Sequence, residues 1–342
     1  MSTQRWFAAL PRWLRLVALL WLVGVTAGCG TAAVPQGVAI RAVDNRREGM
    51  PTLSTQAPHA REWRVMRHDG DVPEGDTIFR AATRLRAALV GKELVELELR
   101  RDPRGQRAPE AGTTITAVDS TGKHLLMHFS DGCVLHTHMQ MTGTWHVYRR
   151  GERWRRPGHS ARVIVRVDDG ASAVCFAAPI VELRRENDAR DRPTRASRML
   201  ERLGPDLCEP GIDLDTVMAR LASLEPDTEL ASALLDQRVA AGIGNVFKSE
   251  VCWAERVHPF RALSDLDELT RRRVYETARH QLAANLTQAR RTTYRGGLAV
   301  YGRTGRGCPR CGERIVSRRD RTARSTYWCP ACQPEVIAGC AP

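Results

Sequence analysis

The sequence predicts an α+β protein, and three patterns along the chain carry this prediction. Apolar and polar residues alternate in segments between residues 93 and about 185, which is typical of a β-sandwich or barrel. Helical periodicity dominates from Met199 to about Gln288. Two Cys-x-x-Cys pairs follow near the carboxyl end, with the spacing of a metal-bound finger. We therefore expect a β-rich domain, then a helical domain, then a four-cysteine finger.

Composition narrows the class of partner. The chain has 342 residues with 42% hydrophobic content, enough for a sizeable core and more than one domain. The formal charge of +13 favours a polyanionic partner, with nucleic acid ahead of an anionic membrane surface. A merely soluble basic protein is the alternative. Among the 52 basic residues only Lys92, Lys123 and Lys248 are lysines. Arginine is therefore the usual cation of this chain, and each lysine raises the question of why arginine does not stand in its place.

The first seventy residues differ from the rest. Arginines, an apolar run from Leu16 to Val25 and small residues up to Cys29 resemble a secretory or lipoprotein signal. The run is about ten residues, well under the roughly 20 that span a bilayer. From Thr31 to Gly70 there is little hydrophobic periodicity. We expect residues 1–71 to be a disordered or non-native extension, and we expect no membrane association.

The elements follow in order. The stretch "TIFRAATRLRAAL" has apolar residues at helical spacing, with Asp76 or Thr77 as candidate N-cap. Strands are expected within residues 93–100, 113–118, 123–129, 133–139 and 161–167, separated by turns such as Ser130-Asp131-Gly132 and Asp168-Asp169-Gly170. The charged segment "RRENDARDRPTRAS" is the expected linker to the helical domain.

A glycine loop lies inside the helical region. Gly242, Gly244 and Asn245 stand between two helical patterns in "LLDQRVAAGIGNVFKSE". Glycines bring backbone N–H groups close to an anion, and the following helix adds a partial positive charge at its N-terminus. Glycines also simply end helices. The loop is therefore a candidate phosphate site whose assignment depends on its context.

The finger is expected to hold one structural Zn²⁺. Cys308 and Cys311 form the first pair, and Cys329 and Cys332 the second. Four thiolates suit a closed tetrahedral zinc site with no open position for catalysis. The arginines around these ligands form either a solvated charged face or a surface that binds DNA phosphates. They are Arg303, Arg306, Arg310, Arg314, Arg318, Arg319, Arg321 and Arg324. The cysteines Cys133, Cys175, Cys208 and Cys252 stand singly, which favours a reduced, cytoplasmic setting.

Several separate motifs resemble one family, the formamidopyrimidine-DNA glycosylases and endonuclease VIII enzymes of base-excision repair. The similarity runs from Pro73 to about Gln333 and is carried by "PEGDT", "GKHLLMHF", "HTHMQMTGTW", "LGPD", "LLDQRVAAGIGN", "VYGRTGRGC" and "RSTYWCPAC". "PEGDT" is more similar to the endonuclease VIII branch. The resemblance implies a catalytic β-sandwich flanked by helices over 73–190, a helix-two-turns-helix domain over 197–295 and a zinc finger over 300–335.

The resemblance implies that Pro73 is the nucleophile, acting as an N-terminal secondary amine. An amine forms a Schiff base with the sugar C1′, whereas the nitrogen of a peptide bond has a delocalised lone pair and cannot. Pro73 follows Val72 in the printed sequence. We expect the working polypeptide to start at Val72, as a GTG start codon would allow, with the initiating Met removed before Pro73.

Further roles follow from the resemblance, residue by residue. Glu74 is the expected acid that protonates the sugar oxygen or the leaving base. Lys123 is expected to contact backbone phosphate and to assist β-elimination. Asn245 and Arg324 are expected to bind phosphates on either side of the lesion and to favour extrusion of the damaged nucleotide. This grip is also expected to position δ-elimination, which places Arg324 among the expected catalytic residues.

The segment Gln140-Met141-Thr142 corresponds to the family's loop that fills the vacated base stack. A small Thr142 replaces a bulky residue of some relatives, so which of the three intercalates stays open. A packed methionine in a β-turn is the alternative. His136 and His138 lie on one strand face, but the sequence offers no third ligand nearby, so they are expected to be structural or DNA-facing rather than metal ligands.

Together these features predict a bifunctional DNA glycosylase and abasic-site lyase that removes oxidised bases, pyrimidines above all, and cleaves by β,δ-elimination. Its expected partner is damaged double-stranded DNA, and we expect a cytoplasmic, nucleoid-associated monomer. A non-catalytic DNA-binding zinc-finger protein is the alternative if Pro73 stays blocked. A lipoprotein with a zinc ribbon is a third.

Overall fold

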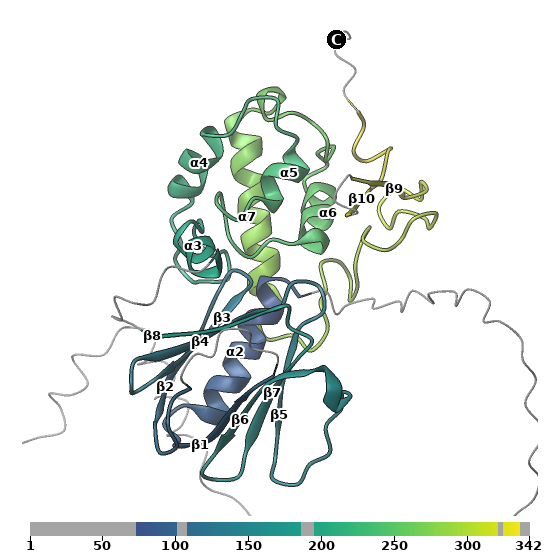
Figure 1. The fold of residues 1–342 in the computed structure, drawn as a ribbon. Helices are drawn as coiled ribbons and strands as arrows, with labels where there is room; N and C mark the ends of the chain where they lie inside the picture. Colours follow the sequence, from purple (N-terminus) through teal and green to yellow (C-terminus); the bar gives the residue numbers. More distant parts are fainter. Residues whose placement is uncertain (1–72, 101–107, 186–194, 321–323, 336–342) are drawn as a thin grey trace, which may run out of the picture. The chain divides into compact units, whose positions relative to one another are not determined.

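The computed structural model describes residues 73–100, 108–185, 195–320 and 324–335. The expected N-terminal extension and most of the expected linker lie outside these residues. The described elements follow one another as a β-rich part, a helical part and a small hairpin (Figure 1). None of the described helices is long and apolar enough to cross a membrane.

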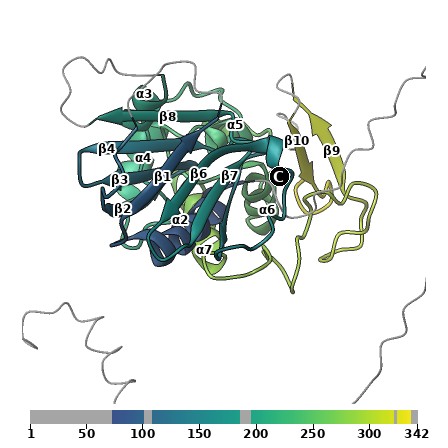
Figure 2. The same cartoon turned by 60° about the horizontal axis from the view of Figure 1, so that its bottom comes forward.

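The β-rich part is a sandwich of two antiparallel four-stranded sheets. One sheet has the order β1-β6-β7-β5 and the other the order β2-β3-β4-β8. The strand pairing gives two separate sheets, which lie one over the other in Figure 2, and this decides between the sandwich and the barrel left open by the sequence. The bounds are β1 Leu94–Leu99, β2 Ile115–Thr121, β3 His124–Phe129, β4 Cys133–His138, β5 Thr144–Tyr148, β6 Ala161–Val167, β7 Ser172–Phe176 and β8 Ile180–Arg185.

Alternation along the strands explains the core of the sandwich. In β3, Leu125, Met127 and Phe129 point into the core and are at most 3% exposed. The five strands expected from the sequence are present, and the turns at Gly132 and Gly170 have the positive φ angles that glycine allows. β5, β7 and β8 complete the expected β-rich region, which ends at Arg185.

Helix α2, Gly75–Leu89, packs on the sandwich through Ile78, Ala82, Leu85 and Leu89. These residues recur at helical spacing, as the sequence predicts. The expected cap was wrong, because the N-cap residue is Glu74 rather than Asp76 or Thr77. Neither Glu74 nor Asp76 uses its side chain to cap α2. Both carboxyl groups instead contact the helical part of the chain.

The helical part consists of α3 Arg195–Glu201, α4 Leu214–Ala222, α5 Leu230–Leu235, α6 Asn245–Ala254 and α7 Glu268–Ala284, as the sequence periodicity predicts. Asp213 and Asp267 cap α4 and α7 by accepting backbone N–H groups. Tyr275 and Leu282 of α7 are fully buried against the other helices. This packing fixes α6, whose first residue is Asn245.

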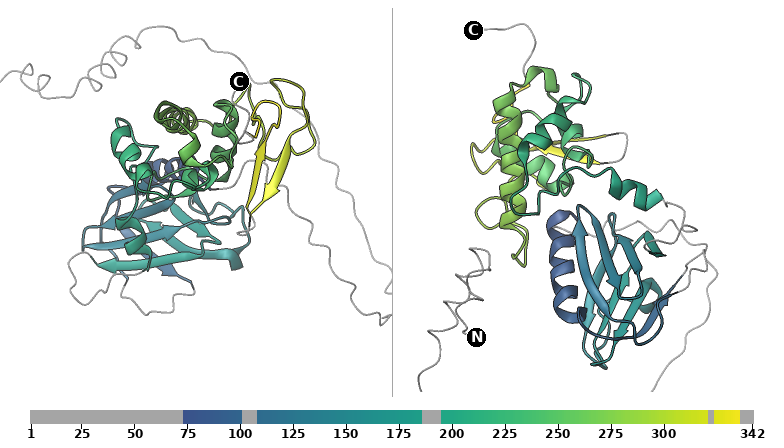
Figure 3. Two further views of the ribbon diagram at one scale, coloured as in Figure 1. Left: turned by 90° about the horizontal axis from the view of Figure 1, so that it is seen from above. Right: turned by 90° about the vertical axis from the view of Figure 1, so that its left-hand side faces the viewer.

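The finger is the hairpin of β9 Val316–Arg319 and β10 Ser325–Trp328, which lies beside α6 (Figure 3). Two of its arginines contact the helical part of the chain. The Arg310 guanidinium lies 4.0 Å from the centre of the Trp253 ring, and Arg318 lies 3.3 Å from the centre of the Phe260 ring and pairs with Glu229. The expected basic face is therefore partly a set of contacts between finger and helices.

Candidate functional site

Glu74 and Gly75, which directly follow Pro73, lie against the glycine loop of the helical part. Pro73 is buried, and the next peptide unit is tied to the loop because Gly75 N–H donates to the Gly242 carbonyl oxygen at 2.9 Å. The Glu74 side chain is fully buried. Its two oxygens accept the backbone N–H groups of Gly244, Val246 and Phe247 at 3.1, 2.7 and 3.2 Å.

Glu74 therefore caps α6 from a distant part of the chain. Those N–H groups lie at the start of a helix, where they have no partner within the helix and where the helix dipole favours negative charge. Both oxygens act as acceptors, as in a carboxylate. In this structure Glu74 thus joins the first residues of the sandwich to α6.

Two glycines make this contact possible. A Cβ atom on Gly244 would lie 2.2 Å from Cδ of Glu74, and one on Gly75 would lie 2.8 Å from the Gly242 Cα atom and from Cys208 Sγ. The chain can approach this closely only where side chains are absent. The glycine loop therefore serves the Glu74 contact as well as any anion.

Gln237 and Asp206 brace the loop, and their roles did not emerge from the sequence. Gln237 Oε1 accepts the Gly242 N–H at 3.1 Å, while its Nε2 donates to the Ile243 carbonyl at 2.9 Å. Asp206 accepts the N–H groups of Gly122 at 2.6 Å and Cys208 at 2.9 Å, and burial raises its pKa. Their presence in the motifs "LLDQ" and "LGPD" is the signal that could have indicated them.

Lys123 reaches the same loop from the turn before β3. Its Nζ donates to the Ile243 carbonyl oxygen at 2.8 Å. Burial lowers the pKa of Lys123 to about 8; Glu74 opposes this shift, and the cations Arg324 and Arg291 add to it. Such an amine exchanges its proton near neutral pH, which suits proton transfer.

Asn245 and Arg324 come together across the boundary between α6 and the finger. Asn245 Nδ2 donates to the carbonyl oxygen of Ser325 at 2.8 Å, next to Arg324 in the chain. Arg324 is exposed, and its backbone N–H donates to Asp320 Oδ1 at 2.9 Å. The two expected phosphate contacts are thus neighbours.

The turn from Met139 to Gly143 exposes one large apolar side chain, that of Met141. Met139 is buried, and its carbonyl oxygen accepts the N–H groups of Thr142 and Gly143. Gln140 has a left-handed φ of 46°, and Thr142 Oγ1 donates to the Ala177 carbonyl oxygen at 3.0 Å. Met141 is 61% exposed. The turn therefore holds Met141 outward, and no hydrogen bond among the described residues joins Gln140 or Met141 to Pro73 or Glu74.

A third imidazole joins the two histidines expected on one strand face. His124 Nδ1 lies 2.8 Å from His136 Nε2, and the His124 and His138 rings are 4.4 Å apart. Burial lowers the pKa of His124 to about 2, and those of His136 and His138 to about 4. His124 and His136 are nearly inaccessible, which makes them structural rather than DNA-facing.

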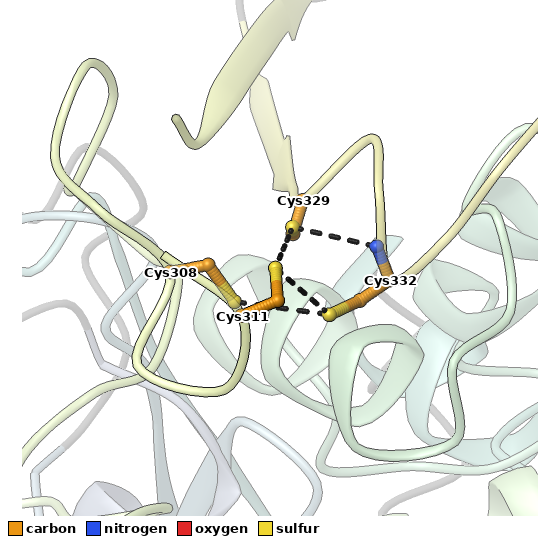
Figure 4. Close-up of side chains that lie close together, drawn as sticks. All are labelled: Cys308, Cys311, Cys329 and Cys332. Carbon is orange, nitrogen blue, oxygen red and sulfur yellow. Dashed lines mark hydrogen bonds between the residues drawn. The ribbon is translucent and has the colours of Figure 1, made fainter. Parts of the chain in front are cut away.

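The four finger cysteines converge as their spacing predicts (Figure 4). Their sulfur atoms all lie within 4.8 Å of one another, and they are the one metal-binding cluster of His, Cys, Asp and Glu in the described part of the chain. The separations Cys311–Cys329, Cys311–Cys332 and Cys308–Cys332 are 3.5, 3.4 and 3.9 Å. A tetrahedron with Zn–S bonds of about 2.3 Å has edges of about 3.8 Å, so the set fits a metal ion. Trp253 Nε1–H donates to Cys308 Sγ at 3.3 Å.

Comparison with known proteins agrees with this geometry. The family model described as "Formamidopyrimidine-DNA glycosylase N-terminal domain" matches residues 72–179, and that described as "Formamidopyrimidine-DNA glycosylase H2TH domain" matches residues 203–295. The chain is 39% identical over 269 residues to "Probable endonuclease 8 2" of Streptomyces coelicolor, covering 77% of this chain and 94% of that protein. It is 38% identical to "DNA-(apurinic or apyrimidinic site) lyase Nei2" of Mycolicibacterium smegmatis, covering 77% and 99%.

Solved structures share the fold. The MutM (Fpg) protein of Thermus thermophilus has a TM-score of 0.64 with 30% identity, covering 78% of this chain and all of that one. The Lactococcus lactis formamidopyrimidine-DNA glycosylase bound to abasic-site DNA has a TM-score of 0.64 with 20% identity, covering 77% of this chain and all of that one.

The chain therefore belongs to the formamidopyrimidine-DNA glycosylase and endonuclease 8 family. It is a DNA N-glycosylase and abasic-site lyase of base-excision repair, and its fold is the α+β fold expected from the sequence.

Proposed function

We propose that this enzyme removes oxidised bases, chiefly pyrimidines, from double-stranded DNA through a Schiff base on Pro73, and then cleaves the strand by β,δ-elimination. One observation supports this most directly. Glu74 and Gly75, directly after Pro73, contact the same glycine loop that Lys123 contacts and that leads into the helix of Asn245.

The reaction starts with attack of the Pro73 nitrogen lone pair on C1′ while the bond from C1′ to the base breaks. Glu74, the next residue, delivers a proton to the sugar oxygen or to the leaving base, and ring opening with loss of the amine proton gives an iminium ion, the protonated Schiff base. Loss of a proton from C2′ then expels the 3′-phosphate, and a second elimination expels the 5′-phosphate. Lys123 serves as the amine that accepts or donates a proton near the phosphates.

The imine can form only if the Pro73 nitrogen is a free amine. We therefore propose that the active polypeptide begins at Pro73. Domain limits of 73–190, 197–295 and 300–335 remain our proposal for the rest of the chain. A cytoplasmic enzyme close to the nucleoid fits a chromosomal substrate, and we propose that it acts as a monomer.

DNA contacts are proposed at two places. Asn245 and Arg324 bind phosphates beside the lesion, because Asn245 is the first residue of α6, where the helix dipole favours anions, and its amide contacts Ser325, the neighbour of the exposed Arg324. Met141 fills the vacated stack, because it is the exposed apolar side chain of its turn, and Gln140 contacts the neighbouring base.

A single Zn²⁺ is the metal we propose for Cys308, Cys311, Cys329 and Cys332. Zinc would supply structural bonds that hold the hairpin carrying Arg324. One equivalent of zinc in purified protein, lost in Cys311→Ser but kept in the exposed control Arg314→Gln, is the expected result. Full DNA binding by a zinc-free chain would contradict it.

Borohydride trapping on abasic-site duplex tests the nucleophile. Chain beginning at Pro73 is expected to give a covalent adduct, and Pro73→Gly in the same form should give far less. Chain keeping Val72 and everything before it should bind the duplex without trapping, as a DNA-binding protein that is not catalytic. Equal trapping by both forms would show that another amine is the nucleophile. A panel of oxidised pyrimidines and 8-oxoguanine tests the base preference.

A further inference from the structure

Lys248 is the one fully buried lysine of the three, and the proposed reaction does not use it. Of the other two, Lys92 pairs with Asp169 and is 29% exposed in its side chain, while Lys123 lies at the glycine loop. Lys248 is 1% exposed. Its Nζ donates to Asn245 Oδ1 at 2.6 Å and to Thr326 Oγ1 at 2.7 Å.

The ammonium group of Lys248 has no carboxylate partner in the part of the chain that the structure describes. Both of its hydrogen-bond acceptors are neutral. The more distant groups that act on it include the carboxylates Asp320 and Glu74 and the cation Arg324, and burial lowers its pKa to about 8. A buried cation without a partner is costly. An anion arriving at this place would offset that cost.

The hydrogen bond to Asn245 also decides how its amide is oriented. An ammonium group only donates, so the side-chain oxygen of Asn245 must face Lys248 and the NH₂ group must point the other way. That NH₂ group donates to Ser325, beside Arg324. Without Lys248 the amide could rotate and present its oxygen, which would repel a phosphate.

Lys248 further joins two elements. Thr326 belongs to β10 of the finger, whereas Lys248 and Asn245 belong to α6. The residues that follow Thr326 and Lys248 are also joined, because the Tyr327 backbone N–H donates to Ser249 Oγ at 3.3 Å. These contacts fix the start of α6 against the strand that follows Arg324.

We propose that Lys248 is a positioning residue for DNA phosphate, which holds the Asn245 amide with its NH₂ group turned toward Ser325, beside Arg324. This inference rests on the proposed phosphate binding by those two residues. It assigns Lys248 no direct contact with DNA and no part in the Schiff base.

Equilibrium binding to a duplex containing a tetrahydrofuran abasic-site analogue tests the inference without any chemical step. Lys248→Met keeps the length of the side chain and removes its charge and donors. We expect its Kd to rise about 10- to 100-fold, the range for a hydrogen bond to a charged group. The matched control Lys92→Met should stay within about twofold, because Lys92 only forms a surface ion pair.

A double-mutant cycle separates positioning from general loss of charge. Adding Lys248→Met to an Asn245→Ala variant should change Kd by no more than about threefold, because the amide to be oriented is gone. Equal losses on both backgrounds, or wild-type affinity of Lys248→Met, would overturn the inference. Zinc content and thermal midpoint are measured throughout. Should Lys248→Met fail to fold, Lys248→Gln, which keeps a donor, is used and should weaken binding about tenfold.

The result is distinguishable from failure of the proposed function. If the wild-type chain itself does not bind the abasic-site duplex, the proposed DNA site is wrong and this inference falls with it. If the wild type binds and Lys248→Met binds equally well, the DNA site stands and the positioning role of Lys248 is refuted.

Discussion

A single Cβ atom added to Gly244 would disrupt the contact between the glycine loop and Glu74. The carboxylate occupies the space that a side chain on Gly244 would need, and through it the residue after the nucleophile is fixed to α6. The position of Pro73 therefore depends on a residue far away in the sequence.

Gly244→Ala is expected to displace Glu74 and to reduce trapping on abasic-site DNA by at least about tenfold, with a loss of about 1–3 kcal/mol in unfolding free energy from overpacking. Trapping kinetics and urea denaturation measure the two effects. Gly297→Ala is the control, since a Cβ atom there meets nothing within 4 Å. Wild-type trapping by Gly244→Ala would contradict the assigned contact.

The sequence indicated some of these residues and not others. Pro73, Glu74, Lys123, Asn245 and Arg324 stand in motifs whose order is specific, and the structure brings them to one loop and its neighbouring hairpin. The roles of Lys248 and Arg291 could not be predicted, because they depend on contacts between residues far apart in the chain. Arg291 in particular is one of many arginines, and nothing local distinguishes it.

Among the elements, strands β3 and β4 bring together the imidazole rings of His124, His136 and His138. His124 lies opposite His138 in the antiparallel register, and His136 lies two residues from His138 on the same strand, opposite Leu126. The rings are neutral in the folded protein because burial, mutual repulsion and the nearby cations Lys123 and Arg184 disfavour their protonation. The sequence predicted both strands, but only their register brings the three rings together.

Acid should therefore destabilise the sandwich through these histidines. The pKa of His136 is about 4 when folded and near 6.5 when unfolded, so the unfolded chain binds more protons between these values and stability falls as pH falls from 6.5 towards 4. His136→Gln loses a hydrogen bond at pH 7.5 but lacks this titration, so its deficit relative to wild type should shrink by about 2–3 kcal/mol at pH 4.5.

Denaturant unfolding at the two pH values measures this effect. His159→Gln is the control, because His159 is exposed and should keep the wild-type pH dependence. A deficit of His136→Gln that is the same at pH 4.5 and pH 7.5 would exclude the histidine cluster as the source of acid sensitivity.

For the molecule as a whole, a buried ion pair ties the sandwich to the segment that follows α7. Asp76, in the first turn of α2, accepts from Arg291 Nε at 2.9 Å and also from its Nη2. Both side chains are almost completely buried. The Arg291 guanidinium also lies 5.0 Å from the centre of the Phe247 ring, whose backbone N–H donates to Glu74.

Arg291→Met should cost about 3 kcal/mol of unfolding free energy, because the buried Asp76 carboxylate then keeps only the longer contact with Arg80, at 3.4 Å, as an ion pair. Asp76→Asn combined with Arg291→Met should cost less than the sum of the two single changes. Urea denaturation of all four proteins measures the coupling. The exposed pair Asp215 and Arg272 is the control, where the same substitutions should cost no more than about 1 kcal/mol. Additive losses at Asp76 and Arg291 would contradict the assigned tie.

The order of β-rich, helical and finger parts was predictable because each has its own local period or spacing. How these parts are joined was not, since Glu74, Asp76 and Gln237 are ordinary polar residues in sequence and acquire their roles only by reaching across the chain.

Because Glu74 accepts the first N–H groups of a helix that begins about 170 residues later, residues 73–76 and the glycine loop form one structural unit. Chimaeras that exchange the sandwich of this enzyme for that of a relative should work only when both halves of the unit come from the same parent.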